Sequence, residues 1–194
     1  MDTIGENIEL MQSAPKPKVK YGSVRDLLAA ARIRPEAVYP HFDRFVELLK
    51  SENKILKWTA IDVIGLLSKV DKENKVDAMV GKLTTLMKEG KLITANHAIS
   101  ALSAIASAKP RFKQKVAGAL LKAEQYKYET TECKNIVLGK VIEAIRPIAA
   151  SVASKNEIIG FVKRQTRNAR SSTRKKAQQF LKGWESNSRK KTVW

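Results

Sequence analysis

Residues 57–67 read KWTAIDVIGLL, and a related pattern returns three more times further along the chain. In each copy, a basic or small residue is followed three positions later by a small apolar residue, and four positions after that by an aliphatic one. The small apolar residues are Ala60, Ala98, Val137 and Ala177, which stand 38, 39 and 40 residues apart. Within each copy, the spacing of three and then four residues places the three side chains of the pattern on one face of an α-helix. The pattern therefore predicts four equivalent helices with a period near 40 residues.

Further helical segments lie between these copies, and they span residues 74–88, 110–124 and 155–168. Helical periodicity runs from about Ser23 to about Trp184, with short polar or Pro/Gly breaks. We expect Ser23 to cap the first helix and Pro35 to begin the next one. No alternating strand pattern occurs in the sequence, and Ala, Leu, Ile and Lys dominate it, so the fold class is predicted to be all-α.

A two-helix unit with this period resembles the HEAT family of α-solenoids. Residues 57–67 look like the second helix of that family, because a cation at Lys57 is followed by Ala60 and then by Gly65. The third and fourth copies depart from this pattern, since Ile142 and Lys182 stand where the first copy has Gly65. The resemblance implies four to five antiparallel helix pairs stacked into a gently curved rod, with the second helices lining its concave face. Small residues would let these helices approach closely.

Three parts are expected along the chain. Residues 1–22 carry Pro15 and Pro17 among lysines and are expected to form a flexible arm or a weak capping helix. Residues 23–185 form the HEAT-like repeat domain, and residues 186–194 form a basic tail.

Signatures of catalysis and of metal binding are missing from the sequence. The single Cys133 precedes a helical segment and is expected to be an inert thiol, because one cysteine supports neither a disulfide framework nor a cysteine zinc site. His41 and His97 stand far apart, and His97 falls at a position that carries unrelated residue types in the other copies. The sequence holds no glycine-rich phosphate loop, nucleophile elbow or paired-histidine zinc motif. We therefore expect a protein that is not an enzyme and that uses no cofactor or metal.

Two further absences in the sequence bear on where the protein is located. No apolar run approaches the roughly 20 residues that span a bilayer, and the N-terminus lacks the apolar stretch of a secretory signal. We expect a protein that does not insert into membranes and that is located in the cytoplasm, or in the nucleus if its source is eukaryotic.

Trp58 and Asp62 stand one turn apart on one helix face. They resemble the Trp and Asp pair that HEAT-like alkylpurine DNA glycosylases use against a damaged nucleotide. By that resemblance, Trp58 would contact the substrate and Asp62 would assist departure of the base. The structural alternative is that Trp58 fills the joint between repeats and Asp62 pairs with a nearby lysine. We favour this alternative, because the pair lies in the less basic half of the chain.

The net charge of +18 indicates an anionic partner. The excess is uneven, because residues 1–50 have a net charge of +1, whereas residues 155–194 hold 12 basic and 2 acidic side chains, a net charge of +10. Arginine is common in this last stretch, and its planar fork suits phosphate. The predicted anion-binding residues are Lys163, Arg164, Arg167, Arg170, Arg174, Lys175, Lys176 and Lys182.

A second group of cations recurs with the repeat. Lys57, Lys134 and Arg174 open three of the four copies of the pattern. In HEAT-type stacks such a column commonly pairs with acids or carbonyls between repeats. We therefore expect a structural ladder here rather than a ligand site.

These observations favour a non-enzymatic binding module. Its first predicted partner is nucleic acid, DNA or RNA, contacted at its phosphates without sequence specificity. The alternative is a scaffold that binds an acidic segment of another protein, where charge would act mainly on the association rate. The glycosylase is the third hypothesis, and it requires Trp58 and Asp62 to lie in one basic cleft.

Overall fold

The computed structural model describes residues 3–191, with side chains described as far as Ser186. Every regular element in this range is helical, and no strand occurs in it, which confirms the all-α prediction. The α-helices are α1 (Thr3–Ser13), α2 (Pro17–Ile33), α3 (Pro35–Val38), α4 (Phe42–Leu48), α5 (Lys54–Leu67), α6 (Met79–Lys88), α7 (Leu92–Ala108), α8 (Lys113–Leu121), α9 (Thr131–Ile145), α10 (Lys155–Gln165) and α11 (Ser171–Lys191). Short 3₁₀ helices lie at 39–41, 75–78, 110–112, 122–125 and 149–151.

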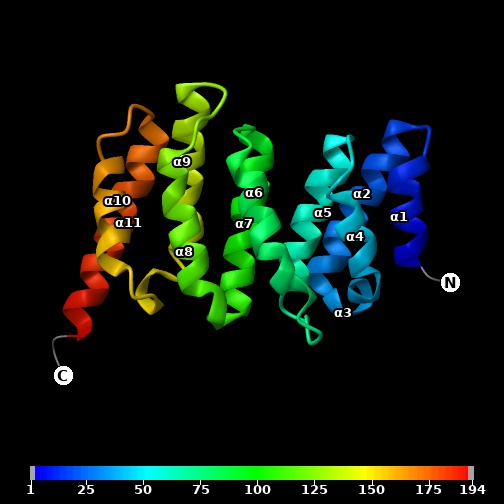
Figure 1. The fold of residues 1–194 in the computed structure, drawn as a ribbon, viewed down its shortest axis with the longest axis horizontal. Helices are drawn as coiled ribbons and strands as arrows, with labels where there is room; N and C mark the ends of the chain where they lie inside the picture. The colour runs from blue at the N-terminus through cyan, green and yellow to red at the C-terminus, as the bar shows by residue number, and fades with distance from the viewer. Residues whose placement is uncertain (1–2, 192–194) are drawn as a thin grey trace.

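The helices stand side by side in one row that follows the order of the chain (Figure 1). Along this row α2, α5, α7, α9 and α11 contact one another in succession, and we call them the second layer. We call α1, α4, α6, α8 and α10 the first layer, and each of them packs on a second-layer helix that is its neighbour in the chain. The four helices with the repeated sequence pattern are α5, α7, α9 and α11, all in the second layer.

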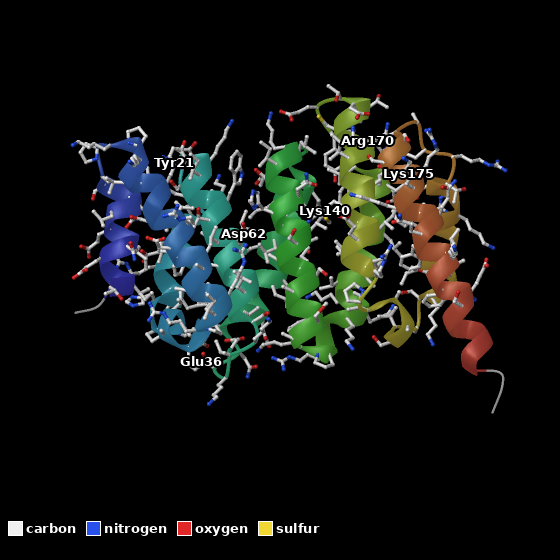
Figure 2. All side chains as sticks on the ribbon, turned by 180° about the vertical axis from the view of Figure 1, so that it is seen from behind. Tyr21, Glu36, Asp62, Lys140, Arg170 and Lys175 are labelled. Carbon is white, nitrogen blue, oxygen red and sulfur yellow. The ribbon has the colours of Figure 1, made fainter. Side chains whose placement is uncertain are left out.

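All second-layer helices begin at the same edge of the row, because neighbouring first- and second-layer helices are antiparallel (Figures 1 and 2). We call this the helix-start edge. It holds the loops 14–16, 49–53, 89–91, 126–130 and 166–170. The opposite edge holds the connections from one helix pair to the next, at 34–41, 68–78, 109–112 and 146–154.

One apolar core runs along the whole row between the two layers. It extends from Ile8 and Met11 in α1 to Phe161 in α10 and Phe180 in α11, all of them buried. Neither layer has another apolar surface against which to bury these side chains, so each helix pair depends on its neighbours for a continuous core.

Small residues set the distance between second-layer helices, as the sequence predicted. A Cβ atom added to Gly65 of α5 would lie 2.7 Å from the Cα of Ala101 in α7, so only glycine permits this approach. In α9 the close approach occurs at Gly139, where a Cβ would lie 2.7 Å from the Oγ1 of Thr173. Gly139 stands about one turn before Ile142, the residue that the repeat aligned with Gly65. Ile142 is buried in the core instead.

The predicted start of the first repeat helix is wrong. Ser23 is not an N-cap, because α2 begins six residues earlier at Pro17. Ser23 is buried in the helix, and its hydroxyl donates a hydrogen bond to the carbonyl of Val19 at 3.2 Å, a bond that occupies a serine side chain inside a helix. The predicted start at Pro35 is confirmed by α3.

Two segments at the ends of the chain extend the row. α1 buries Ile4, Ile8 and Met11 and packs on α2. At the other end, α11 runs on to Lys191 through most of the predicted basic tail, 186–194. Residues 192–194 of that tail, and the side chains of 187–194, lie outside the described residues.

Candidate functional site

The eight predicted anion-binding residues all lie in α10, α11 or the loop between them. Seven of them gather at or near the helix-start edge, because the end of α10 and the start of α11 meet there (Figure 2). Lys182 lies 11 residues into α11, which is about 16 Å along the helix. The structure therefore brings most of the predicted residues to one end of one edge.

Two of the predicted arginines are bound to acids of the preceding helix pair. Arg164 holds Glu124 with two hydrogen bonds, from Nε to Oε1 at 3.1 Å and from Nη2 to Oε2 at 2.7 Å. These bonds raise the pKa of Arg164. Arg170 donates to Glu132 at the start of α9. Both arginines therefore tie the last helix pair to the one before it.

Two further cations are engaged within the fold. Nη1 of Arg174 donates to the carbonyls of Asn168 and Ala169 at 2.8 and 2.7 Å, which closes the loop before α11. Nζ of Lys176 lies 2.9 Å from Oε1 of Glu143 in α9. The positions of these two side chains are set by the fold.

The other four predicted residues are exposed. Lys163, Arg167, Lys175 and Lys182 make no hydrogen bond through their side chains and no ion pair with any described residue. Glu124 and Glu132 of the preceding helix pair are held by Arg164 and Arg170. These four cations keep their charge available to a partner.

The predicted cation column has no common role. Arg174 bonds to carbonyls of its own loop rather than to a neighbouring repeat. Lys57 and Lys134 are half-buried and form no ion pair with any residue in the described range. The three residues occupy similar places in their helices, yet among the described contacts only Arg174 has hydrogen-bond partners for its side chain.

Trp58 and Asp62 lie at the joint between α5 and α7. The indole N–H of Trp58 donates to the hydroxyl of Thr94 at 3.0 Å, and its ring stacks on His97 with the centroids 5.7 Å apart. Nδ1 of His97 lies 2.8 Å from Oδ1 of Asp62. Asp62 thus pairs with a histidine and not with a lysine, and His97 holds a defined contact that the sequence analysis missed. The four residues fasten α5 to α7.

A small cavity of about 280 Å³ lies beside this joint. Arg32, Asp62, His97 and Ser100 supply its polar lining, over the small residues where α5 and α7 approach closely. Because the carboxylate of Asp62 faces the same space as Arg32, a phosphate placed there would meet a negative charge. The cavity is therefore poorly suited to phosphate.

A larger cavity of about 640 Å³ opens at the opposite edge. Beside it, Nζ of Lys109 lies 2.5 Å from Oδ2 of Asp71, and their side chains are 7% and 0% exposed. Asp71 also accepts a hydrogen bond from the hydroxyl of Tyr39 at 2.6 Å. Nζ of Lys109 donates in turn to the amide oxygen of Asn74 at 2.9 Å. These polar groups satisfy one another, so the network joins three consecutive helix pairs.

The charge of Asp71 makes stability depend on pH. Burial raises the pKa of Asp71, but the hydrogen bonds from Lys109, Tyr39 and the amide of Val76 outweigh it and hold the pKa below the ordinary value of 3.8. A depressed pKa in the folded state stabilises the protein at pH values above the ordinary pKa of the carboxyl group. This stability is lost as the pH falls through the pKa of the folded state. We expect the free energy of unfolding to decline below about pH 4.

Urea unfolding of the native chain and of Asp71→Asn, measured at several acid pH values, tests this expectation. The variant should show a shallower dependence on pH, because it lacks the titrating carboxyl group. Equal dependences in the two proteins would show that other acids cause the decline.

Three other features of the described residues bear on metal binding, membranes and thiol chemistry. No three His, Cys, Asp or Glu side chains among the described residues lie where they could hold a metal ion. None of the described helices is long and apolar enough to cross a membrane. Cys133 is half-buried near the start of α9.

Comparisons with known proteins show a similarity in fold only. No protein-family model matches the chain, and no curated protein matches it. Two similar solved structures are engineered proteins determined by the Northeast Structural Genomics Consortium. One is 17% identical with a TM-score of 0.53, covering 96% of this chain and all of that chain. The other is 15% identical with a TM-score of 0.52, covering 96% and 98%.

Proposed function

We propose that this protein is a non-enzymatic binding module that contacts the phosphates of nucleic acid through the basic end formed by α10 and α11. The proposal rests on four exposed cations that have no acid partner among the described residues: Lys163, Arg167, Lys175 and Lys182. Like charges on one surface repel one another, and a polyanion relieves that repulsion.

The surrounding contacts support the proposal, because they hold the basic surface in place. Arg164 and Arg170 fix α10 and the loop to the preceding helices, and Arg174 closes the loop. The exposed cations consequently project from a supported surface, so that less conformational entropy is lost when a ligand binds.

We also infer that the row of helix pairs is an α-solenoid of the HEAT type. Contacts between second-layer helices support this inference, because they recur at nearly the repeat spacing. Trp58 and Thr94 are 36 residues apart, and Asn135 and Thr173 are 38 apart. A cytoplasmic or nuclear location follows from the proposed partner and stays a proposal.

A salt titration with matched charge variants tests the function. One variant carries Lys163→Gln, Arg167→Gln, Lys175→Gln and Lys182→Gln, and binding of labelled nucleic acid is followed by fluorescence anisotropy. Each cation that neutralises a phosphate contributes about 0.9 to the slope of log affinity against log salt for B-DNA. We expect the slope to fall by about one for each contacting cation removed.

The control removes the same charge from the opposite edge, by replacing four exposed lysines with glutamine: Lys69, Lys72, Lys115 and Lys155. It should keep most of the affinity and the slope of the native chain. Equal losses in both variants would mean that binding follows net charge and not this surface. Failure of the native chain to bind at low salt would overturn the proposal and leave an acidic protein segment as the favoured partner.

A further inference from the structure

The helix-start edge carries two basic clusters, one at each end of the row. The first consists of Lys16, Lys18 and Lys20 at the start of α2, within residues 10–25, a stretch that holds no acid. The second consists of the exposed cations Lys163, Arg167 and Lys175 around the start of α11. It lies within residues 158–184, which also hold no acid. We call them the N-end and C-end clusters, and Figure 1 shows α2 and α11 near the two ends of the row.

The part of the edge between the clusters mixes eight bases with six acids, a net charge of +2. Its charged residues are Glu47, Lys50, Glu52, Lys54, Lys57, Lys88, Glu89, Lys91, Lys122, Glu124, Lys127, Glu129, Glu132 and Lys134. Several of these acids are paired, as Lys91 is with Glu129 at 3.0 Å. The stretches of this edge that hold bases without any acid are therefore at its two ends.

The opposite edge differs in that it combines ion pairs with exposed lysines. Asp43, Asp71 and Asp77 pair with Lys75, Lys109 and Arg111 in turn. Figure 2 places Glu36 at this edge and Tyr21, Arg170 and Lys175 toward the helix-start edge. Local helix electrostatics do not account for the basic clusters, because cations at a helix N-terminus are opposed by the helix dipole. Neither α2 nor α11 carries an acid in its first turn.

The separation of the clusters matches a feature of duplex nucleic acid. Four helix-to-helix steps lead from α2 to α11 through α5, α7 and α9. At about 8–10 Å a step, this is about 32–40 Å. One turn of B-form duplex is about 34–36 Å. A straight duplex lying along the edge would thus present the same backbone strand to both clusters.

A single strand fits this edge less well, because non-specific binders of single strands stack bases on exposed aromatic rings. Among the described residues at this edge, Tyr21 is exposed, but the hydroxyls of Tyr126 and Tyr128 are buried. The indole of Trp58 is half-buried and already stacked on His97. The edge therefore offers charge without a series of stacking surfaces.

We infer that the helix-start edge binds duplex nucleic acid lengthwise, with backbone contacts at the N-end and C-end clusters about one helical turn apart. This inference rests on the proposed function and extends it to a second contact, one that the C-terminal basic segment alone does not supply. The middle of the edge, where acids and bases are mixed, faces the groove between the two contacts.

The test compares two duplex lengths on the full chain. A duplex of 8 base pairs is about 27 Å long and cannot reach both clusters, whereas one of 16 base pairs, about 54 Å long, reaches both. The N-end variant is Lys16→Gln, Lys18→Gln and Lys20→Gln. The C-end variant is Lys163→Gln, Arg167→Gln and Lys175→Gln. Lys69→Gln, Lys72→Gln and Lys115→Gln form the control with the same charge.

On the long duplex, we expect both end variants to lower the salt slope by about two to three, and the control to leave it nearly unchanged. On the short duplex, the N-end variant should bind almost as the native chain does, because the intact C-end cluster suffices. A long-duplex slope that responds only to the C-end variant would overturn the two-ended contact and leave the proposed function standing. A single strand of 16 nucleotides bound as tightly, with equal losses in both end variants, would overturn the duplex geometry. Absence of binding to every probe at low salt would overturn the proposed function itself.

Discussion

Replacing Lys109 by methionine is expected to lower the free energy of unfolding by about 3–5 kcal/mol. The substitution keeps most of the side-chain volume but removes the ammonium group 2.5 Å from the fully buried carboxylate of Asp71. The carboxylate would then remain in the interior with only the hydrogen bonds from Tyr39 and two backbone amides. An uncompensated buried charge is far more costly than a lost surface ion pair.

Urea unfolding measures this loss, and Lys72→Met provides the control in the neighbouring loop. Lys72 is exposed, so its replacement should change stability by no more than about 0.5 kcal/mol. Combining Lys109→Met with Asp71→Asn should restore part of the loss, because the second change removes the unpaired charge. A Lys109→Met protein as stable as the Lys72→Met protein would mean that the network contributes little to folding.

Gly65→Ala is expected to destabilise the protein by about 1–3 kcal/mol, although alanine is the better helix former. The added methyl group would lie 2.7 Å from the Cα and 2.9 Å from the Cβ of Ala101, and a backbone atom cannot turn aside as a long side chain can. α5 and α7 would have to move apart. That movement would strain the neighbouring contact of Trp58 with His97, whose rings stack 5.7 Å apart.

The same substitution in α6 should have the opposite sign. Gly81 is exposed, and a Cβ added there would meet nothing within 4 Å. Gly81→Ala should therefore stabilise the protein by about 0.5–1 kcal/mol, through the lower backbone entropy of the unfolded chain. Thermal unfolding of the two variants side by side isolates the packing contribution. Similar shifts in both would contradict the close approach of α5 and α7.

Much of the helical architecture could be predicted because its cause is local. The small apolar residue in each of the four repeat helices, such as Ala60 or Ala98, recurs at a spacing that the sequence itself displays. Helix starts were harder where two signals competed. Ser23 has the side chain of a cap, but Pro17 six residues earlier begins the helix, and the serine then bonds to Val19 within it. Composition alone does not distinguish a capping serine from a buried one.

The contacts of the site could not be predicted, because most of them join residues more than 30 positions apart in the sequence. The charge count made Arg164 and Arg170 look as available as Lys163, whereas Glu124 and Glu132 hold them from another helix pair. Lys109 precedes Pro110 at a helix break, and no local sequence signal marks it as buried, yet it is buried against Asp71. Which charge is paired depends on the register between helices, and that register emerges only when the pairs are stacked.

Because the second-layer helices are parallel and evenly stacked, the length of the row depends on the number of helix pairs. Each additional helix pair would lengthen the helix-start edge by about 8–10 Å, close to a quarter of a duplex turn, while leaving both ends chemically unchanged. The number of pairs therefore sets the distance between the N-end and C-end clusters. A chain with one pair more or one pair fewer would keep its two end clusters but would set them out of phase with the duplex.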